Sequence, residues 1–104
     1  MARFDVYENP DTATRGEVPY LVDLQAPMLN GLSTRIVAPL FTEKAFGTPI
    51  SRINPVFVIG RRRVVMSTAE LAGIPASRLG PHAGSLAVHS AEILAALDLL
   101  FSGY

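Results

Sequence analysis

Histidine, serine and carboxylate side chains are the groups in this chain whose types could support hydrolytic or metal chemistry. The two histidines, His82 and His89, are seven residues apart, whereas metal-binding helices place their ligands three or four residues apart with a carboxylate nearby. No serine occupies a Gly-x-Ser-x-Gly turn, no glycine-rich phosphate loop occurs, and cysteine is absent. We therefore predict no catalytic residues, no metal site and no cofactor, and we expect that the chain is not an enzyme.

Asp23 is the carboxylate with two interpretations, because it lies inside the apolar run VPYLVDLQ. It could act as a general base. A carboxylate in such a strand more often faces solvent or pairs with an arginine, and Arg35 on the following strand is the available partner. Since no acid, base and oxyanion donor occur together at a recognisable spacing, the sequence favours one of these two structural roles over catalysis.

Arg61, Arg62 and Arg63 form the only run of like charge. In one interpretation they are a hairpin tip that contacts phosphate. In the other they are a solvated turn between two apolar strands, where charge discourages edge pairing. Nine basic residues balance nine acidic ones, so the net charge is zero, and this balance favours the solvated turn. It also predicts no direct sequence-specific DNA binding by the chain alone.

The elements that position these groups are predicted from hydrophobic periodicity. Period-two patterns and turn residues predict strands at 2–7, 18–25, 34–40, 55–60 and 63–68, with the third strand ending at Pro39. Residues 68–73 resemble one helical turn, and 76–84 read as a loop. Apolar residues at helical spacing predict an amphipathic helix over about 85–101. The order predicts an α+β domain: a small antiparallel sheet covered by a C-terminal helix.

Composition bounds the class of protein. The chain has 104 residues, of which 49% are apolar and 17% charged, as expected of a single globular domain spanning 1–104. No apolar run approaches the roughly 18 residues of a membrane span. The opening MARFDVYENP lacks the apolar core of a signal peptide, so we expect a cytoplasmic protein without a membrane partner.

The chain ends unusually on LLFSGY, with an aromatic ring one residue beyond a glycine. Phe101 and Tyr104 could fold back to cover the core. Alternatively, Gly103 lets the chain leave the helix and presents Tyr104 to a partner, since tyrosine buries much area with few rotatable bonds. The residues alone leave both alternatives open.

Short motifs along nearly the whole chain resemble, in the same order, those of the CcdB family of bacterial toxins. They are Val22-Asp23-x-Gln25, Arg35-x-Val37-x-Pro39-Leu40, Pro55-Val56-x-x-Ile59-Gly60 and the ending Phe101-x-Gly103. The resemblance implies a partly open barrel shared with MazF-type toxins, and a homodimer that performs no chemistry. It further implies that the dimer binds the DNA gyrase A subunit and traps the gyrase–DNA cleavage complex. A cognate CcdA-like antitoxin would neutralise it, with roles in plasmid maintenance and transcription autoregulation.

The resemblance also implies which residues contact the gyrase. By position they are Met28, Leu29, Asp98, Ser102, Gly103 and Tyr104. The tryptophan of the family is Ser102 here, and the chain contains no tryptophan, so Tyr104 is the ring available to stack on a guanidinium. Two alternatives stay open: a relative that no longer poisons gyrase, and a MazF-like endoribonuclease that would use Arg15, the arginine run or His89.

Overall fold

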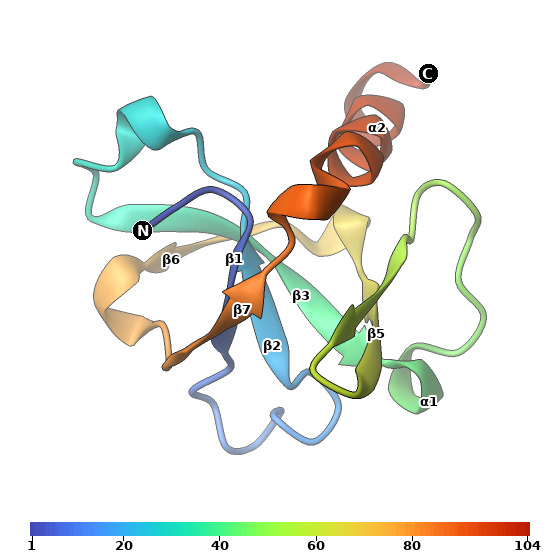
Figure 1. The fold of residues 1–104 in the computed structure, drawn as a ribbon, viewed down its shortest axis with the longest axis horizontal. Helices are drawn as coiled ribbons and strands as arrows, with labels where there is room; N and C mark the ends of the chain where they lie inside the picture. The colour runs from blue at the N-terminus through green and yellow to red at the C-terminus, as the bar shows by residue number, and fades with distance from the viewer.

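Seven antiparallel strands and one long C-terminal helix make up the computed structural model, which describes residues 1–104. The sheet order is β4-β5-β3-β2-β1-β7, with β6 paired to β3. The strands are β1 (Asp5–Glu8), β2 (Tyr20–Asp23), β3 (Thr34–Thr42), β4 (Val56–Ile59), β5 (Arg62–Met66), β6 (Ala72–Pro75) and β7 (His82–Ser85). The helices are α1 (Glu43–Phe46) and α2 (Ser90–Ser102), with 3₁₀ turns η1 (Pro27–Leu29), η2 (Thr68–Glu70), η3 (Ala76–Arg78) and η4 (Ala87–His89). The sheet curls into a half-barrel (Figure 1), which confirms the predicted α+β class.

Strand β3 is the centre of the sheet because it is long enough to serve three neighbours. It pairs with β2 along one side, and on the other side with β6 over 34–37 and with β5 over 40–42. Pro39 does not end the strand, contrary to the sequence prediction. Its carbonyl accepts the Ser67 N–H, so its nitrogen faces the same side, in the gap between β6 and β5. A missing N–H costs nothing there.

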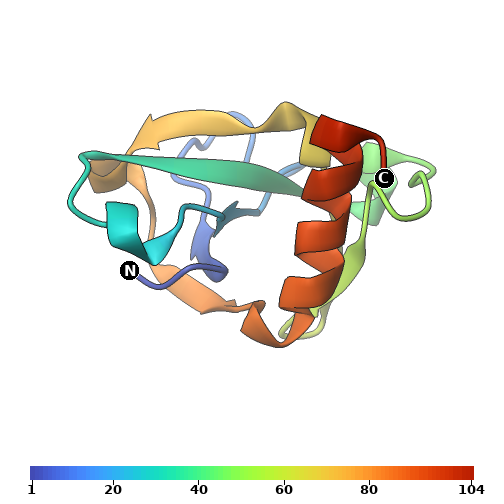
Figure 2. The same ribbon diagram turned by 90° about the horizontal axis from the view of Figure 1, so that it is seen from above.

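The core lies between the concave face of the sheet and the first half of α2. Thirteen buried residues form one cluster. The helix contributes only Ile93 and Ala96 to it, and Leu86 joins from the segment before the helix. Figure 2 shows α2 standing beside the β4–β5 hairpin, with the C-terminus at its far end. The helix therefore closes one end of the half-barrel and leaves its last turns outside the core.

Strands β6 and β7 were missed by the sequence prediction, which assigned a helical turn and a loop to these residues. Neither strand contains a buried residue, so neither has the apolar alternation from which a strand is predicted. Gly73, expected to close a helix, pairs instead with Ile36 in β3. The helix begins at Ser90, later than predicted, because Leu86 is buried from the preceding extended segment and not from α2.

Strand β1 also departs from simple alternation. Phe4 was expected on the strand, yet it precedes β1 with a positive φ of 73°. Val6 and Tyr7 are both buried although they are adjacent. Val6 belongs to the hydrophobic core cluster, whereas Tyr7 lies outside it, with its hydroxyl beside Asp5. The pairing with β7 also shifts register between these two residues.

Candidate partner-binding surface

An open apolar groove separates η1 from α2. It has a volume of about 370 Å³, and eight of its ten lining residues are hydrophobic. Leu29 lines it from η1, Leu32 and Ile36 from the segment that follows, and Leu97 and Phe101 from α2. Leu32 is 52% exposed and Phe101 is 72% exposed. We call these five residues the apolar groove. Exposed apolar side chains gathered in this way mark a surface that binds another molecule.

The loop that carries η1 is held in place by buried polar contacts. Asp23 Oδ2 accepts a hydrogen bond of 3.0 Å from Arg35 Nε, and Arg35 Nη1 donates to Asn30 Oδ1 at 2.7 Å. Gln25 Nε2 donates to the Leu29 carbonyl at 2.9 Å. These contacts tie the C-terminal end of η1 to the sheet, although none of its three residues is buried.

The ion pair considered between Asp23 and Arg35 is present. Both side chains are buried, with 0% and 1% of their surface exposed. Asp23 Oδ1 accepts the Gln25 N–H at 3.0 Å, and Oδ2 accepts from Arg35. Because both oxygens are occupied and no solvent reaches them, the carboxylate serves the architecture of the sheet.

The end of α2 projects the last residue outward. Gly103 has a φ of 81° and its N–H donates to the Leu99 carbonyl at 3.0 Å. This left-handed cap ends the helix and is a conformation that glycine adopts without steric cost. Tyr104 follows with 86% of its surface exposed. Of the two arrangements considered from sequence, the structure shows the outward one.

The six residues expected to contact a partner do not form one continuous patch. Leu29 lines the apolar groove, whereas Met28, beside it, is 88% exposed and does not line the groove. The others are Asp98, Ser102, Gly103 and Tyr104, all exposed on α2 or beyond it. Figures 1 and 2 both show η1 and the C-terminus at opposite ends of the molecule. Within one chain, the groove lies between the two halves of the expected site.

Of the five groove residues, the sequence assigned only Leu29 to a partner site; it missed Leu32, Ile36, Leu97 and Phe101. Leu32 follows the Asn30-Gly31 turn, where an apolar residue has no reason to be buried. Ile36 lies between the buried residues Arg35 and Val37, so it must face the other side of β3. An apolar residue on the outward face of a strand was the signal available for this surface.

The titratable side chains lie apart from the groove. His82 on β7 approaches Asp5, with Nε2 3.5 Å from Oδ1, and His89 on η4 approaches Glu92, with Nδ1 3.2 Å from Oε1. Histidine and carboxylate side chains do not gather in groups of three that could hold a metal ion. Burial raises the pKa of Tyr7 above its ordinary value of 10.0, and the nearby carboxylates of Asp5 and Asp23 add to the increase.

A curled antiparallel sheet closed by a C-terminal helix, with an exposed apolar groove beside that helix, defines a small α+β domain. The family model described as CcdB protein matches residues 3–103 of this chain. The chain therefore belongs to the CcdB family, as its motifs indicated, and this membership supports the toxin component of a toxin–antitoxin pair. The helices are too short or too polar to cross a bilayer; α2, the longest, has 13 residues.

Proposed function

We propose that this protein is a cytoplasmic toxin that binds the DNA gyrase A subunit, traps the gyrase–DNA cleavage complex and is neutralised by a CcdA-like antitoxin. Family membership over residues 3–103 supports the assignment. The observation that carries the binding mode is the outward Tyr104, which is 86% exposed beyond the helix cap. A ring in that position can bury area against a partner and stack on a guanidinium.

The binding unit in this proposal is a homodimer. The exposed side chains of the apolar groove support pairing of two copies, and a net charge of zero offers little repulsion between them. An isologous pairing across the groove would place the η1 loop of one copy near the α2 end of the other. This pairing would unite the two halves of the expected site, which lie apart within one chain.

Ser102 lowers the affinity that we expect for gyrase, because it stands where the family has a tryptophan. Serine cannot stack, and loss of an aromatic anchor at an interface costs about 2–4 kcal/mol. The corresponding loss of affinity is roughly 30- to 1,000-fold. Tyr104 is the ring that can offset part of this loss, so we propose gyrase binding that is weaker than a tryptophan at position 102 would provide.

A supercoiling assay with purified gyrase tests the proposal. The full-length protein is expected to inhibit supercoiling at micromolar concentration and to accumulate cleaved DNA. A variant that lacks residues 102–104 should remain folded and lose this inhibition. Addition of the antitoxin should restore supercoiling, and the toxin–antitoxin complex should repress its own promoter.

The same preparations distinguish the alternatives. Absence of inhibition together with tight antitoxin binding would show a relative that no longer poisons gyrase. Cleavage of total RNA by the purified protein, lost on substitution of Arg62, would show an endoribonuclease. Either result would overturn the gyrase assignment.

A further inference from the structure

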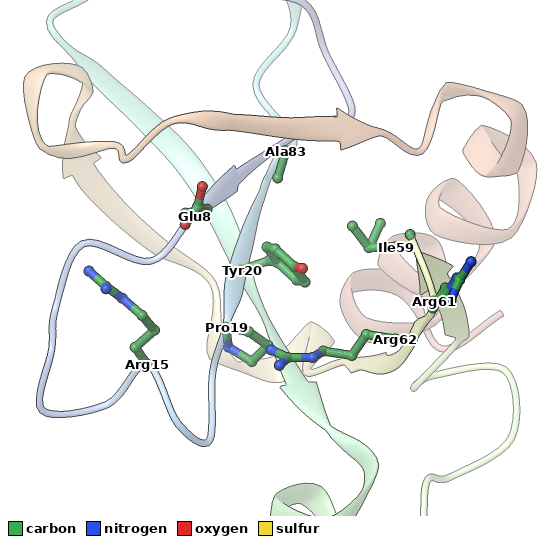
Figure 3. A pocket seen from close by; sticks show the side chains of 9 residues that line it. Glu8, Arg15, Pro19, Tyr20, Ile59, Arg61, Arg62 and Ala83 are labelled. Carbon is green, nitrogen blue, oxygen red and sulfur yellow. The ribbon is translucent and has the colours of Figure 1, made fainter.

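A second concave site lies on the opposite side of the molecule from the C-terminus, between the β4–β5 hairpin tip and the loop that joins β1 to β2. Figure 3 shows this cleft, which has a volume of about 630 Å³. It shares no residue with the apolar groove. Its volume falls in the range of sites that bind small molecules, about 300–1,000 Å³.

Three arginines line the cleft, and none of them forms an ion pair. They are Arg15, Arg61 and Arg62. Arg62 reaches from the hairpin toward Pro19, while Arg15 lies across the cleft on the β1–β2 loop (Figure 3). Arg15 Nε donates to the Asn9 carbonyl at 2.9 Å, which fixes the side chain and leaves Nη1 without a protein acceptor.

Arg63 provides an internal contrast to these arginines. It belongs to the same run, yet it does not line the cleft, and its Nε lies 3.0 Å from Glu43 Oε1. The protein thus neutralises the arginine that lies outside the cleft, and it leaves the cleft arginines without a carboxylate partner. Guanidinium groups without a carboxylate partner are suited to bind phosphate, which they can hold with two parallel hydrogen bonds.

The less polar part of the cleft lining lies between the arginines. The ring of Tyr20 lies at its centre in Figure 3, with Ile59 and Ala83 beside it. An aromatic ring between arginines can stack on a nucleobase. Glu8 lies on the far wall, where its carboxylate can accept a hydrogen bond from an amino group.

We propose that this cleft binds a nucleoside 5′-phosphate, with the phosphate on Arg62, the base on Tyr20 and its amino group toward Glu8. A stretch of acidic peptide fits less well, because Glu8 would repel it and it would leave the ring unused. The phosphate can belong to a free nucleotide or to the 5′ end of a single strand. Binding here is independent of gyrase binding.

Amide chemical shifts of the ¹⁵N-labelled full-length protein test the proposal with adenosine 5′-monophosphate as the probe. Saturable shifts are expected at Tyr20, Gly60 and Arg61. Arg62→Gln should weaken binding about tenfold or more. The matched control Arg63→Gln should change it less than about twofold, because that side chain lies outside the cleft. Both variants should keep wild-type activity against gyrase.

The probes also separate the sources of the phosphate. Tighter binding of a 5′-phosphorylated oligonucleotide than of the mononucleotide would identify a strand end, and equal binding would identify a free nucleotide. The proposal is overturned if adenosine without phosphate binds as well, if millimolar nucleotide produces no saturable shift, or if Arg63→Gln weakens binding as much as Arg62→Gln. Displacement of the nucleotide by an equal concentration of polyglutamate would also overturn it.

Discussion

Asp23 and Arg35 form a fully buried ion pair that joins β2 to β3. Arg35 Nε lies 3.0 Å from Asp23 Oδ2, and at most 1% of either side chain is exposed. The same guanidinium donates to Asn30 Oδ1 at 2.7 Å. One interaction in the sheet therefore also fixes the loop that carries η1, which connects the stability of the fold with the shape of the candidate partner surface.

Removal of the Asp23 charge should destabilise the fold strongly. Asp23→Asn keeps the shape of the side chain but leaves the Arg35 charge buried without a partner, and such a change costs about 3–5 kcal/mol. Urea unfolding should show this decrease in the free energy of unfolding. The double variant Asp23→Leu/Arg35→Met should cost less, because it removes both charges.

The exposed ion pair between Arg63 and Glu43 is the control, with 60% and 48% of the side chains exposed. Glu43→Gln should change the free energy of unfolding by less than about 1 kcal/mol. A cost for Asp23→Asn as small as that of Glu43→Gln would contradict the role given to the buried pair.

Tyr7 should make the fold sensitive to alkaline pH. Burial raises its pKa above 10.0 in the folded state, with Asp5 and Asp23 adding to the effect. Below about pH 10 both states keep the phenol proton, so this contribution to stability is fully present. Above that pH the unfolded chain ionises first, and stability falls as pH approaches the folded pKa. Tyr7→Phe should make the alkaline decline in the free energy of unfolding shallower.

Tyr104→Phe is the matched control for this pH dependence, since it removes a phenol that is 86% exposed. In this variant the free energy of unfolding should decline at alkaline pH as it does in the wild type. An unchanged decline in Tyr7→Phe would refute the assignment to Tyr7.

Gly80 should tolerate no side chain. A Cβ at this position would lie 2.4 Å from the Glu8 carbonyl oxygen, which also accepts the Gly80 N–H at 3.1 Å. Gly80→Ala must therefore push β1 away from the segment that leads into β7, at a cost of about 1–3 kcal/mol. Thermal unfolding measures the loss. Gly31→Ala is the control, because a Cβ there meets no atom within 4 Å, and it should leave the unfolding temperature nearly unchanged.

A tryptophan at position 102 should strengthen the proposed gyrase interaction. Ser102→Trp places an indole on the exposed last turn of α2, and the affinity should rise by roughly 30- to 1,000-fold. The concentration that inhibits supercoiling by half measures the effect. Tyr104→Ala should have the opposite effect and weaken the inhibition. Ser77→Trp on η3 is the control, and an equal gain from it would show that the effect is not specific to the terminus.

The apolar groove should control the oligomeric state. Phe101 is 72% exposed and lines the groove, so Phe101→Ser should shift the proposed homodimer toward monomer without unfolding the chain. Sedimentation velocity measures the change. Val88→Ser is the matched control, because Val88 is 89% exposed but does not line the groove. A wild-type protein that sediments as a monomer at all concentrations would exclude the proposed pairing.

Those parts of the fold that bury side chains regularly could be predicted from the sequence. The β4–β5 hairpin and the pairing partner of Asp23 are examples, because alternating apolar residues and one isolated charge carry the information. β6 and β7 could not be predicted, because their pairing is backbone to backbone and none of their side chains is fully buried. The end of β3 was mispredicted at Pro39, because the nitrogen of Pro39 faces the gap between β6 and β5, and that gap depends on the tertiary structure.

Of the candidate partner surface, the sequence predicted only the residues on η1 and those at the C-terminal end of the chain. Tyr104 was identifiable because an aromatic residue beyond a terminal glycine is conspicuous. Leu32 and Ile36 were not, because a single exposed apolar residue in a sequence looks like any other surface residue. Their convergence with Leu97 and Phe101 depends on how α2 lies relative to β3, which local patterns do not encode.

The uneven anchoring of α2 has a consequence for its motions. Ile93 and Ala96 are its only buried residues, and none of the last six residues of the helix is buried. Those turns are held by backbone hydrogen bonds open to solvent, so their amides should exchange with deuterium faster than those near Ile93. A partner that binds the last turns of α2 must order them, and the conformational entropy lost in doing so lowers its affinity. The part of α2 around Ile93 and Ala96 is therefore anchored to the core, whereas its C-terminal turns are less restrained.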